Sequence, residues 1–211
     1  MHESVQKRYG ELAEKTCCLS CGGAANKVKI TEGEKCADLG CGRGNDTLKM
    51  AGKAGAEGFA YGIDITDKML ETARRQAEKL GVANAAFIKA PLDSTGLPGS
   101  CLDAAISNCT INHAPDKDAV WREIYRILKP GGRFCVSDIY SIGAVPAEYK
   151  NDPDAVAECW AGAVEKDEYL DTLERAGFSD IRILEESEPY DKGKIQVASF
   201  TVWGRKGESG E

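Results

Sequence analysis

Residues 38–44 read DLGCGRG, and this run constrains the fold more than any other part of the chain. Residues 34–37 before it are typical of a buried strand, and residues 45–51 after it are typical of a helix start. A strand, a glycine-rich turn and a helix form a ligand-binding corner in open α/β sheets. Glycines let the backbone approach a ligand closely, and the helix N-terminus offers unpaired N–H groups to it.

The spacing of the loop differs from the dinucleotide-binding fingerprint, which requires a glycine where this chain has Asn45. Here an acidic residue at the strand end precedes alternating glycines, which resembles the first motif of class I S-adenosylmethionine (SAM) methyltransferases. In that family the acidic residue lies near the methionine end of SAM. The alternative is a structural turn followed by a helix-capping aspartate. The predicted cofactor contacts of the loop are Asp38, Gly40, Cys41, Gly42 and Gly44.

A second carboxylate supports the cofactor site. The apolar run at residues 59–63 ends at Asp64, and a carboxylate at the tip of a second strand accepts both ribose hydroxyls. In the loop at residues 90–93 the adenine ring is expected to rest on Leu92, for which plain core packing is the alternative. The remaining predicted cofactor contacts are Ile65, Ala90, Asn108 and, from a helix at residues 1–15 that covers the cleft, Tyr9. Ordinary packing is the alternative for this tyrosine.

The order of elements predicts one α/β domain. Strands are expected near residues 35–39, 59–63, 86–89, 102–107, 133–138, 181–184 and 196–204, with helices near 45–54, 67–80, 117–128 and 166–176. This pattern predicts a doubly wound, mostly parallel seven-stranded sheet with helices on both faces and an antiparallel last strand. The expected divisions are a lid helix and cysteine-bearing loop (1–30), a SAM-binding domain (31–204) with a substrate-covering region (141–165), and a disordered tail (205–211).

Charge and hydropathy exclude several partners. A net charge of −7 over 211 residues argues against nucleic acid, whose binders usually carry a basic face. No apolar run approaches the ~20 residues of a membrane span, and the first residues lack a signal pattern. We expect a cytoplasmic protein with no membrane or nucleic-acid partner. No apolar face is left over, which favours a monomer.

Nine cysteines are many for this length, and free thiols in a reducing compartment bind metals or perform chemistry. Cys18 and Cys21 form a Cys-x-x-Cys pair, but a closed zinc site needs four ligands and no second pair exists. A mobile thiol-bearing loop or an incidental linker remains. Three further cysteines at or near core strands are expected to be buried: Cys36, Cys101 and Cys135.

The acceptor of the methyl group is indicated by the tip of the fourth strand. The aromatic tip typical of nucleic-acid amino-methyltransferases is missing, and a cysteine, Cys109, stands there instead. Fifty residues later Cys159 lies in the region expected to cover the substrate. Two thiols facing one cleft suit a soft acceptor, and trivalent arsenic binds thiolates while it keeps a lone pair.

Several blocks resemble the arsenite methyltransferase family, above all SNCTIN at residues 107–112 and ECWAGA at 158–163. The resemblance implies a small inorganic or organo-arsenic substrate, with arsenic(III) bound by Cys109 and Cys159. It also matches Cys17 or Cys18 to an amino-terminal cysteine of the family. One departure is Thr47, where the family often has a further cysteine. The third thiolate is then expected from the amino-terminal loop or from an external thiol. Glutathione or thioredoxin is expected as the reductant.

Two other functions stay open. One is methylation of a carbon, oxygen or nitrogen atom of a small metabolite. The other is a non-catalytic, SAM-responsive thiol module that binds soft metal ions. His113 lies near the expected cleft, where a proton acceptor and a polar loop residue are both consistent with the sequence.

Overall fold

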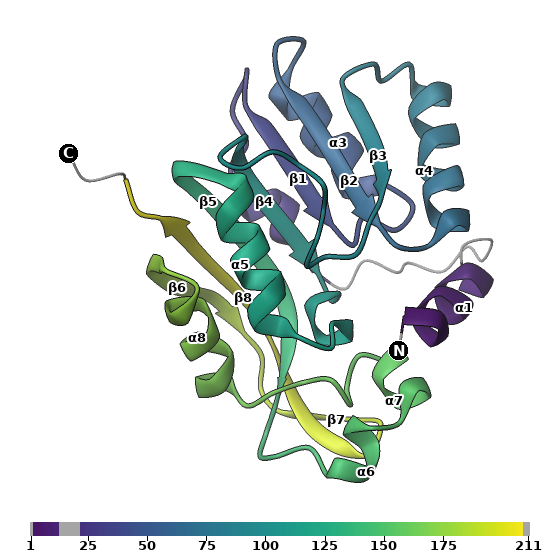
Figure 1. The fold of residues 1–211 in the computed structure, drawn as a ribbon, viewed down its shortest axis with the longest axis vertical. Coiled ribbons are helices and arrows are strands. Elements are labelled where there is room, and N and C mark those ends of the chain that lie inside the picture. Colours follow the sequence, from purple (N-terminus) through teal and green to yellow (C-terminus); the bar gives the residue numbers. More distant parts are fainter. Residues whose placement is uncertain (1, 13–21, 209–211) are drawn as a thin grey trace.

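The strands of the chain form one mixed sheet in the computed structural model, which describes residues 2–12 and 22–208. The strands are β1 (Lys35–Leu39), β2 (Phe59–Asp64), β3 (Ala85–Lys89), β4 (Leu102–Asn108), β5 (Leu128–Ser141), β6 (Phe178–Glu186), β7 (Tyr190–Lys192) and β8 (Ile195–Lys206). Their order is β3-β2-β1-β4-β5-β8-β6, with the short β7 paired to β8 (Figure 1). The first five strands are parallel and β8 is antiparallel to both neighbours. This confirms the predicted fold class; β7 is an additional eighth strand.

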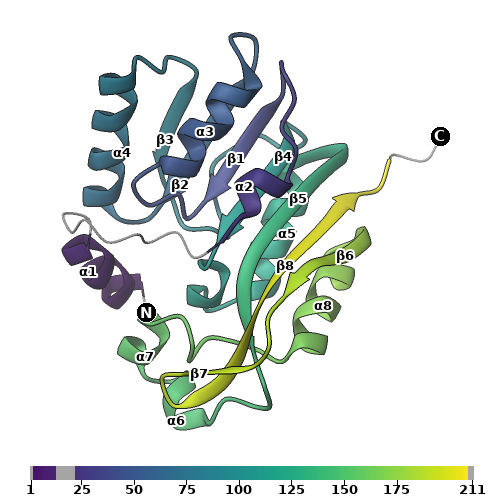
Figure 2. The same cartoon turned by 180° about the vertical axis from the view of Figure 1, so that it is seen from behind.

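Helices cover both faces of the sheet. They are α1 (His2–Leu12), α2 (Ala24–Lys27), α3 (Asn45–Ala54), α4 (Asp67–Leu80), α5 (Lys117–Ile127), α6 (Ala147–Lys150), α7 (Pro153–Ala157) and α8 (Lys166–Arg175), with a 3-10 turn, η1, at Ile111–His113. α5 and α8 lie on one face (Figure 1), and α2 and α3 lie on the other (Figure 2). Among the described residues no helix is long and apolar enough to cross a bilayer.

Two apolar layers explain why the central strands have few polar residues. Ala37 and Leu39 of β1 face the layer under α5, where the fully buried Trp121 packs against Phe134. Cys36 faces the opposite layer, which is formed with α2 and α3. Because β1 is covered on both sides, its neighbouring residues Cys36 and Ala37 are both apolar and buried, although their side chains face opposite layers.

Local signals fix the ends of the helices. α5 begins after Asp116, whose carboxylate accepts a hydrogen bond from the Ala119 N–H at 2.8 Å. α4 ends at Gly81, which has a φ of 66° and donates its N–H to the Ala77 and Glu78 carbonyls. These ends match the sequence prediction because each depends on only a few neighbouring residues.

Part of the segment before the expected boundary at residue 31 packs on the sheet. Ala24, Ala25 and Val28 are buried in the layer shared with α3. The guanidinium of Arg133 on β5 donates to the carbonyls of Val28 and Lys29 and fixes this segment in place. A four-residue helix has no periodicity from which the sequence could reveal this packing.

The last strand extends into the first two residues of the expected tail. β8 continues through Arg205 and Lys206, which pair with the start of β6. The Lys206 ammonium donates to the carbonyls of Tyr125 and Leu128 at 2.9 and 2.8 Å. Residues 209–211 lie outside the described part of the chain, as do residues 13–21.

Between β5 and α8, the region expected to cover the substrate contains two short helices, α6 and α7. Its second half is buried against β5 and β8, in a cluster with Ile139 and Val197. That cluster includes Cys159 and Trp160. α7 also packs against α1. The region expected to cover the substrate and the amino-terminal helix are therefore in contact.

Candidate functional site

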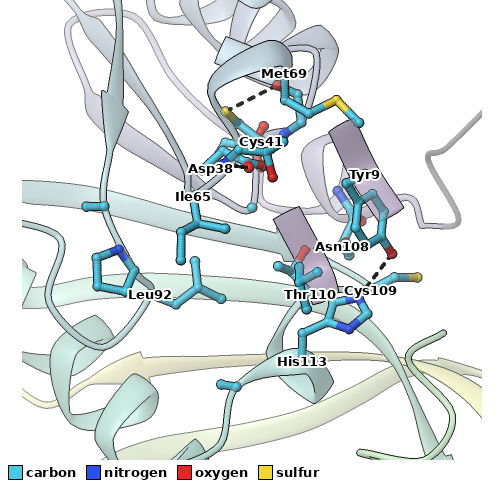
Figure 3. Close-up of a pocket in the computed structure, with 18 of the residues that line it drawn as sticks. Tyr9, Asp38, Cys41, Ile65, Met69, Leu92, Asn108, Cys109, Thr110 and His113 are labelled. Carbon is cyan, nitrogen blue, oxygen red and sulfur yellow. Dashed lines mark hydrogen bonds between the residues drawn. The ribbon is translucent and has the colours of Figure 1, made fainter. Parts of the chain in front are cut away.

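A cleft opens at the carboxyl edge of β1, β2 and β4, where ligands bind in open α/β sheets (Figure 3). It encloses about 1180 Å³ not occupied by protein atoms, open solvent at its mouth included. Ten of the eleven predicted cofactor residues line it: Tyr9, Asp38, Gly40, Cys41, Gly42, Asp64, Ile65, Ala90, Leu92 and Asn108. The exception is Gly44.

The three glycines of the loop have different environments. All have positive φ values, between 51° and 79°, which L-residues rarely adopt. A Cβ on Gly42 would meet only the Met69 sulfur, at 4.0 Å, so the backbone here is open to the cleft. A Cβ on Gly44 would lie 2.7 Å from the Phe87 ring. Gly44 therefore permits close packing at the N-terminus of α3 and does not line the cleft.

Asp64 has the acceptor capacity that a ribose requires. Its Oδ2 accepts the Gly42 N–H at 2.9 Å, and its Oδ1 accepts the Thr66 N–H at 2.8 Å. Each carboxylate oxygen has two acceptor sites, so one on each oxygen remains for a hydroxyl. Burial raises the pKa of Asp64, while the hydrogen bonds from Thr66 and Gly42 lower it.

Asp38 is buried at the end of β1 and lines the same cleft. Burial raises its pKa to about 7, with a hydrogen bond from Thr47 opposing the rise and the charges of Asp46 and Asp64 adding to it. The Thr47 hydroxyl donates to Asp38 Oδ2 at 2.8 Å. A carboxylate in this position can pair with a cation when a ligand supplies one, so the cleft fits SAM, which carries an ammonium and a sulfonium.

Thr47 is the residue that departs from the resemblance, and its position explains the departure. It is fully buried and does not line the cleft. Its hydroxyl holds Asp38 rather than contributing to a substrate site. In the sequence, Thr47 lies in the first turn of the helix that follows the strand ending near Asp38. This placement is the signal from which its contact with Asp38 could have been found.

Asn108 connects the tip of β4 to α3. Its Nδ2 donates to Asp46 Oδ2 at 3.0 Å, and its Oδ1 accepts the Ala24 N–H at 3.4 Å. Asp46 is also paired with Lys49 at 2.8 Å. Asp46 lines the cleft, although the sequence prediction did not include it.

α1 lies over the cleft and contributes Val5 and Tyr9 to its wall. The Gln6 side chain donates to the Ile65 carbonyl at 3.0 Å, and Arg8 forms an ion pair with Glu158 at 3.1 Å. The Tyr9 hydroxyl lies 3.0 Å from His113 Nε2 (Figure 3). α1 is part of the segment for which the sequence predicts a lid.

The two predicted arsenic ligands are neighbours. Cys109 lines the cleft next to Asn108, and Cys159 does not line it. The Cys159 sulfur lies 3.6 Å from the Cys109 carbonyl oxygen and 3.9 Å from Asp138 Oδ1. Both cysteines have left-handed backbones, with φ values of 54° and 77°. Cys17 and Cys18 lie outside the described residues.

Asp138 and Asn112 are a hydrogen-bonded pair of buried polar residues, and Asp138 lies next to the Cys159 sulfur. Asp138 Oδ1 accepts hydrogen bonds from Asn112 Nδ2 and the Ile139 N–H, both at 2.9 Å. Burial raises the pKa of Asp138 to about 6, partly offset by the Ile139 N–H and by Lys117. Asp138 Oδ2 and Asn112 Oδ1 make no hydrogen bond within the part of the chain that the structure describes.

Apart from Cys41 of the glycine loop, the other described cysteines do not line the cleft. Cys36 and Cys135 are fully buried in the core, as predicted, and burial raises the pKa of each thiol to about 12. Cys101 is half-buried at the start of β4. Within residues 2–12 and 22–208, no three His, Cys, Asp or Glu side chains are grouped to hold a metal ion.

Comparisons with known proteins agree with this geometry. Residues 30–177 match a family model described as a methyltransferase domain. Over 98% of its length the chain superposes on 74% of an arsenic(III) S-adenosylmethionine methyltransferase from Chlamydomonas reinhardtii, with a TM-score of 0.78 and 31% identity. The chain belongs to the arsenite methyltransferase family. Its fold is that of the class I SAM-dependent methyltransferases.

Two curated relatives extend the comparison. Arsenite methyltransferases from Halobacterium salinarum and Aquipseudomonas alcaligenes are 33% and 32% identical over 81% and 88% of this methyltransferase. It spans 44% and 64% of their respective lengths. The family match therefore covers the sheet domain and the cysteine blocks, and it does not extend to the remainder of these longer relatives.

Proposed function

We propose that this chain methylates trivalent arsenic, as arsenite or its thiol conjugate, with SAM as the methyl donor. The proximity of the two cysteines carries the proposal: Cys109 lines the cofactor cleft, and the Cys159 sulfur lies 3.6 Å from its carbonyl oxygen. Thiolates are soft ligands that select soft acceptors such as arsenic(III). The arsenite methyltransferases to which the chain is similar support this choice of substrate.

Loading the substrate needs no redox step. When a thiol replaces a hydroxyl of arsenite, the S–H bond breaks, an As–S bond forms, and the hydroxyl leaves with the proton as water. Arsenic remains trivalent and keeps the lone pair that acts as the nucleophile. Cys109 and Cys159 hold it during this exchange, and no general base is needed once it is bound.

The described residues divide the work of binding the cofactor. Bound SAM supplies an electrophilic methyl group on a sulfonium. Asp64 accepts the ribose hydroxyls, Asp38 and the loop at residues 40–44 meet the amino-acid end, and Leu92 supports the adenine. α1 lies over the cleft and excludes water, so the contribution of the protein is placement and a dry site.

The third thiolate and the wider setting complete the proposal. Cys17, Cys18 or Cys21, or an external thiol such as glutathione, provides the third sulfur ligand, because Thr47 has no thiol at the position where the family often has a cysteine. Because transfer of the methyl group would leave arsenic formally pentavalent, glutathione or thioredoxin serves as the reductant that returns it to arsenic(III). The protein acts as a cytoplasmic monomer on a small inorganic or organo-arsenic substrate, without a nucleic-acid partner.

The test is transfer of a labelled methyl group from SAM to arsenite in the presence of thiol. Cys109→Ser and Cys159→Ser are expected to lose arsenite-dependent product while they still bind SAM. Cys101→Ser is the matched control, because this half-buried cysteine does not line the cleft. Full activity in both serine variants would refute the assigned roles. Tight arsenite binding without product would favour a sequestering module.

A further inference from the structure

His113 lies between the cofactor lid and the segment that carries Cys159. It is buried, with 6% of its surface exposed, in η1 directly after the tip of β4. Its Nε2 lies 3.0 Å from the Tyr9 hydroxyl of α1, and its Nδ1 lies 2.9 Å from the Val156 carbonyl oxygen of α7. The Tyr9 and His113 rings also meet edge to face, with centroids 5.4 Å apart.

The two partners determine which nitrogen carries the proton. A carbonyl oxygen only accepts hydrogen bonds, so His113 Nδ1 donates to Val156. Nε2 of the neutral ring is then an acceptor, and the Tyr9 hydroxyl donates to it. Burial lowers the pKa of His113 to about 4, only partly offset by the Val156 carbonyl, so the ring stays neutral near pH 7. The hydrogen bonds therefore run in one direction from the lid to α7.

The chain of contacts ends at the backbone of Cys159. The Val156 carbonyl oxygen that accepts from His113 also accepts the Cys159 N–H, at 2.9 Å. A second link lies one residue away, where Arg8 of α1 pairs with Glu158 at 3.1 Å. α1 is thus connected to Val156 and to Glu158, which lie three residues and one residue before Cys159 in the chain.

α1 also contacts the cofactor cleft directly. Val5 and Tyr9 line the cleft, and Gln6 donates to the Ile65 carbonyl directly after Asp64. A ligand that contacts these residues stabilises α1 in its position over the cleft, which is called the closed position. Through the contacts described above, the same closed position fixes the backbone of Cys159.

We propose that His113 is a positioning residue that couples occupancy of the SAM cleft to placement of the Cys159 thiol. The role in arsenic binding rests on the proposed function, whereas the coupling itself does not require arsenic. Because binding linkage is reciprocal, arsenite bound at Cys159 strengthens cofactor binding by the same factor by which the cofactor strengthens arsenite binding.

Alkylation of Cys159 by iodoacetamide, followed by peptide mass spectrometry, tests the coupling without arsenic. S-adenosylhomocysteine, which fills the cleft without turnover, is expected to slow alkylation of Cys159 in the wild type. Tyr9→Phe removes the donor to His113, and His113→Phe removes both hydrogen bonds of the imidazole. Since a neutral hydrogen bond changes an equilibrium by about twofold to twelvefold, each variant is expected to lose at least about twofold of this protection. The rates of Cys159 alkylation in the wild type and the variants are compared at saturating S-adenosylhomocysteine.

Tyr190→Phe is the matched control, because its hydroxyl bonds to Ser199 on the exposed β7–β8 hairpin, away from the cleft. It is expected to keep the wild-type protection. Absence of protection in the wild type, or full protection in both Tyr9→Phe and His113→Phe, would overturn the proposal. A destabilised variant is recognised by its faster alkylation of the core Cys135.

A calorimetric arm separates this proposal from the proposed function. Arsenite is titrated into each protein with and without S-adenosylhomocysteine, and the ratio of the two dissociation constants is the coupling factor. Tyr9→Phe is expected to lower this factor by about twofold to twelvefold. Protection of Cys159 by S-adenosylhomocysteine together with no arsenite binding would uphold the coupling and refute the arsenic substrate.

Discussion

Substitution of Thr47 by valine gives a direct test of the electrostatics of the cofactor site. Valine keeps the buried volume and the β-branch, and it removes the hydroxyl that donates to Asp38 Oδ2 at 2.8 Å. In the folded protein burial already raises the pKa of Asp38 to about 7, and the Thr47 hydroxyl, together with a backbone hydrogen bond from Thr47 that valine keeps, restrains the rise. The variant therefore has a still higher pKa at Asp38.

The magnitude follows from the hydrogen bond. A bond to a charged group is worth about 1.5–3 kcal/mol, and 1.36 kcal/mol is one pKa unit, so the pKa of Asp38 rises by about one to two units. At pH 7 the ionised fraction falls from about one half to between about one tenth and one hundredth. Because only the ionised form attracts the cationic end of SAM, the affinity falls by about 5- to 50-fold.

The assay is isothermal titration of SAM into both proteins from pH 6 to pH 9. Wild-type affinity is expected to fall as the pH drops through about 7, because Asp38 becomes protonated. In Thr47→Val this fall begins at higher pH, and the affinity recovers toward the wild-type value at pH 9. The control is Thr172→Val, which removes a buried hydroxyl on α8, away from the cleft. Equal affinities of Thr47→Val and wild type at pH 7 would refute the reasoning.

Two further predictions concern the substrate segment and the amino-terminal segment. A Cβ on Gly162 would lie 1.9 Å from the Asn112 carbonyl oxygen, so Gly162→Ala is expected to displace the segment after Cys159 and abolish methyl transfer with SAM affinity retained, measured by product assay and titration. Burial raises the pKa of Glu34, but hydrogen bonds from Arg133 at 2.7 Å and from the Thr31 N–H lower it overall. Stability from this depressed pKa is present above about pH 4.5 and is lost as the pH falls through the folded-state pKa. Glu34→Gln is therefore expected to cost about 1–2 kcal/mol at pH 7 and less near pH 3, measured by urea unfolding.

Features that depend on neighbouring residues could be predicted from the sequence. The corner at residues 38–44 combines a strand, positive-φ glycines and a helix start within a few positions, and all three occur as expected. Asp64 could be predicted because an apolar run ends at it and the parallel sheet brings its tip beside that of β1. Both inferences use periodicity and the general geometry of parallel sheets.

Features that depend on long-range packing could not be predicted. α2 is four residues long, and its burial arises from α3 and from the guanidinium of Arg133, more than 100 positions away from Val28. The role of His113 is equally invisible in the sequence, because its two partners lie in segments that meet only in the folded chain. A lone histidine near a cleft has many explanations until its neighbours are known.

The backbone conformation of Cys109 and Cys159 bears on whether their side chains are functional or incidental. Five non-glycine residues in the described ranges have positive φ, and two of them are Cys109 and Cys159. A left-handed backbone costs an L-residue about 1–2 kcal/mol, which glycine avoids and asparagine reduces. A cysteine selected only for packing would give way to glycine at such a position. Cysteine at two left-handed positions whose atoms lie 3.6 Å apart supports the proposal that the two sulfurs bind substrate, because strained backbone of this kind clusters at functional sites.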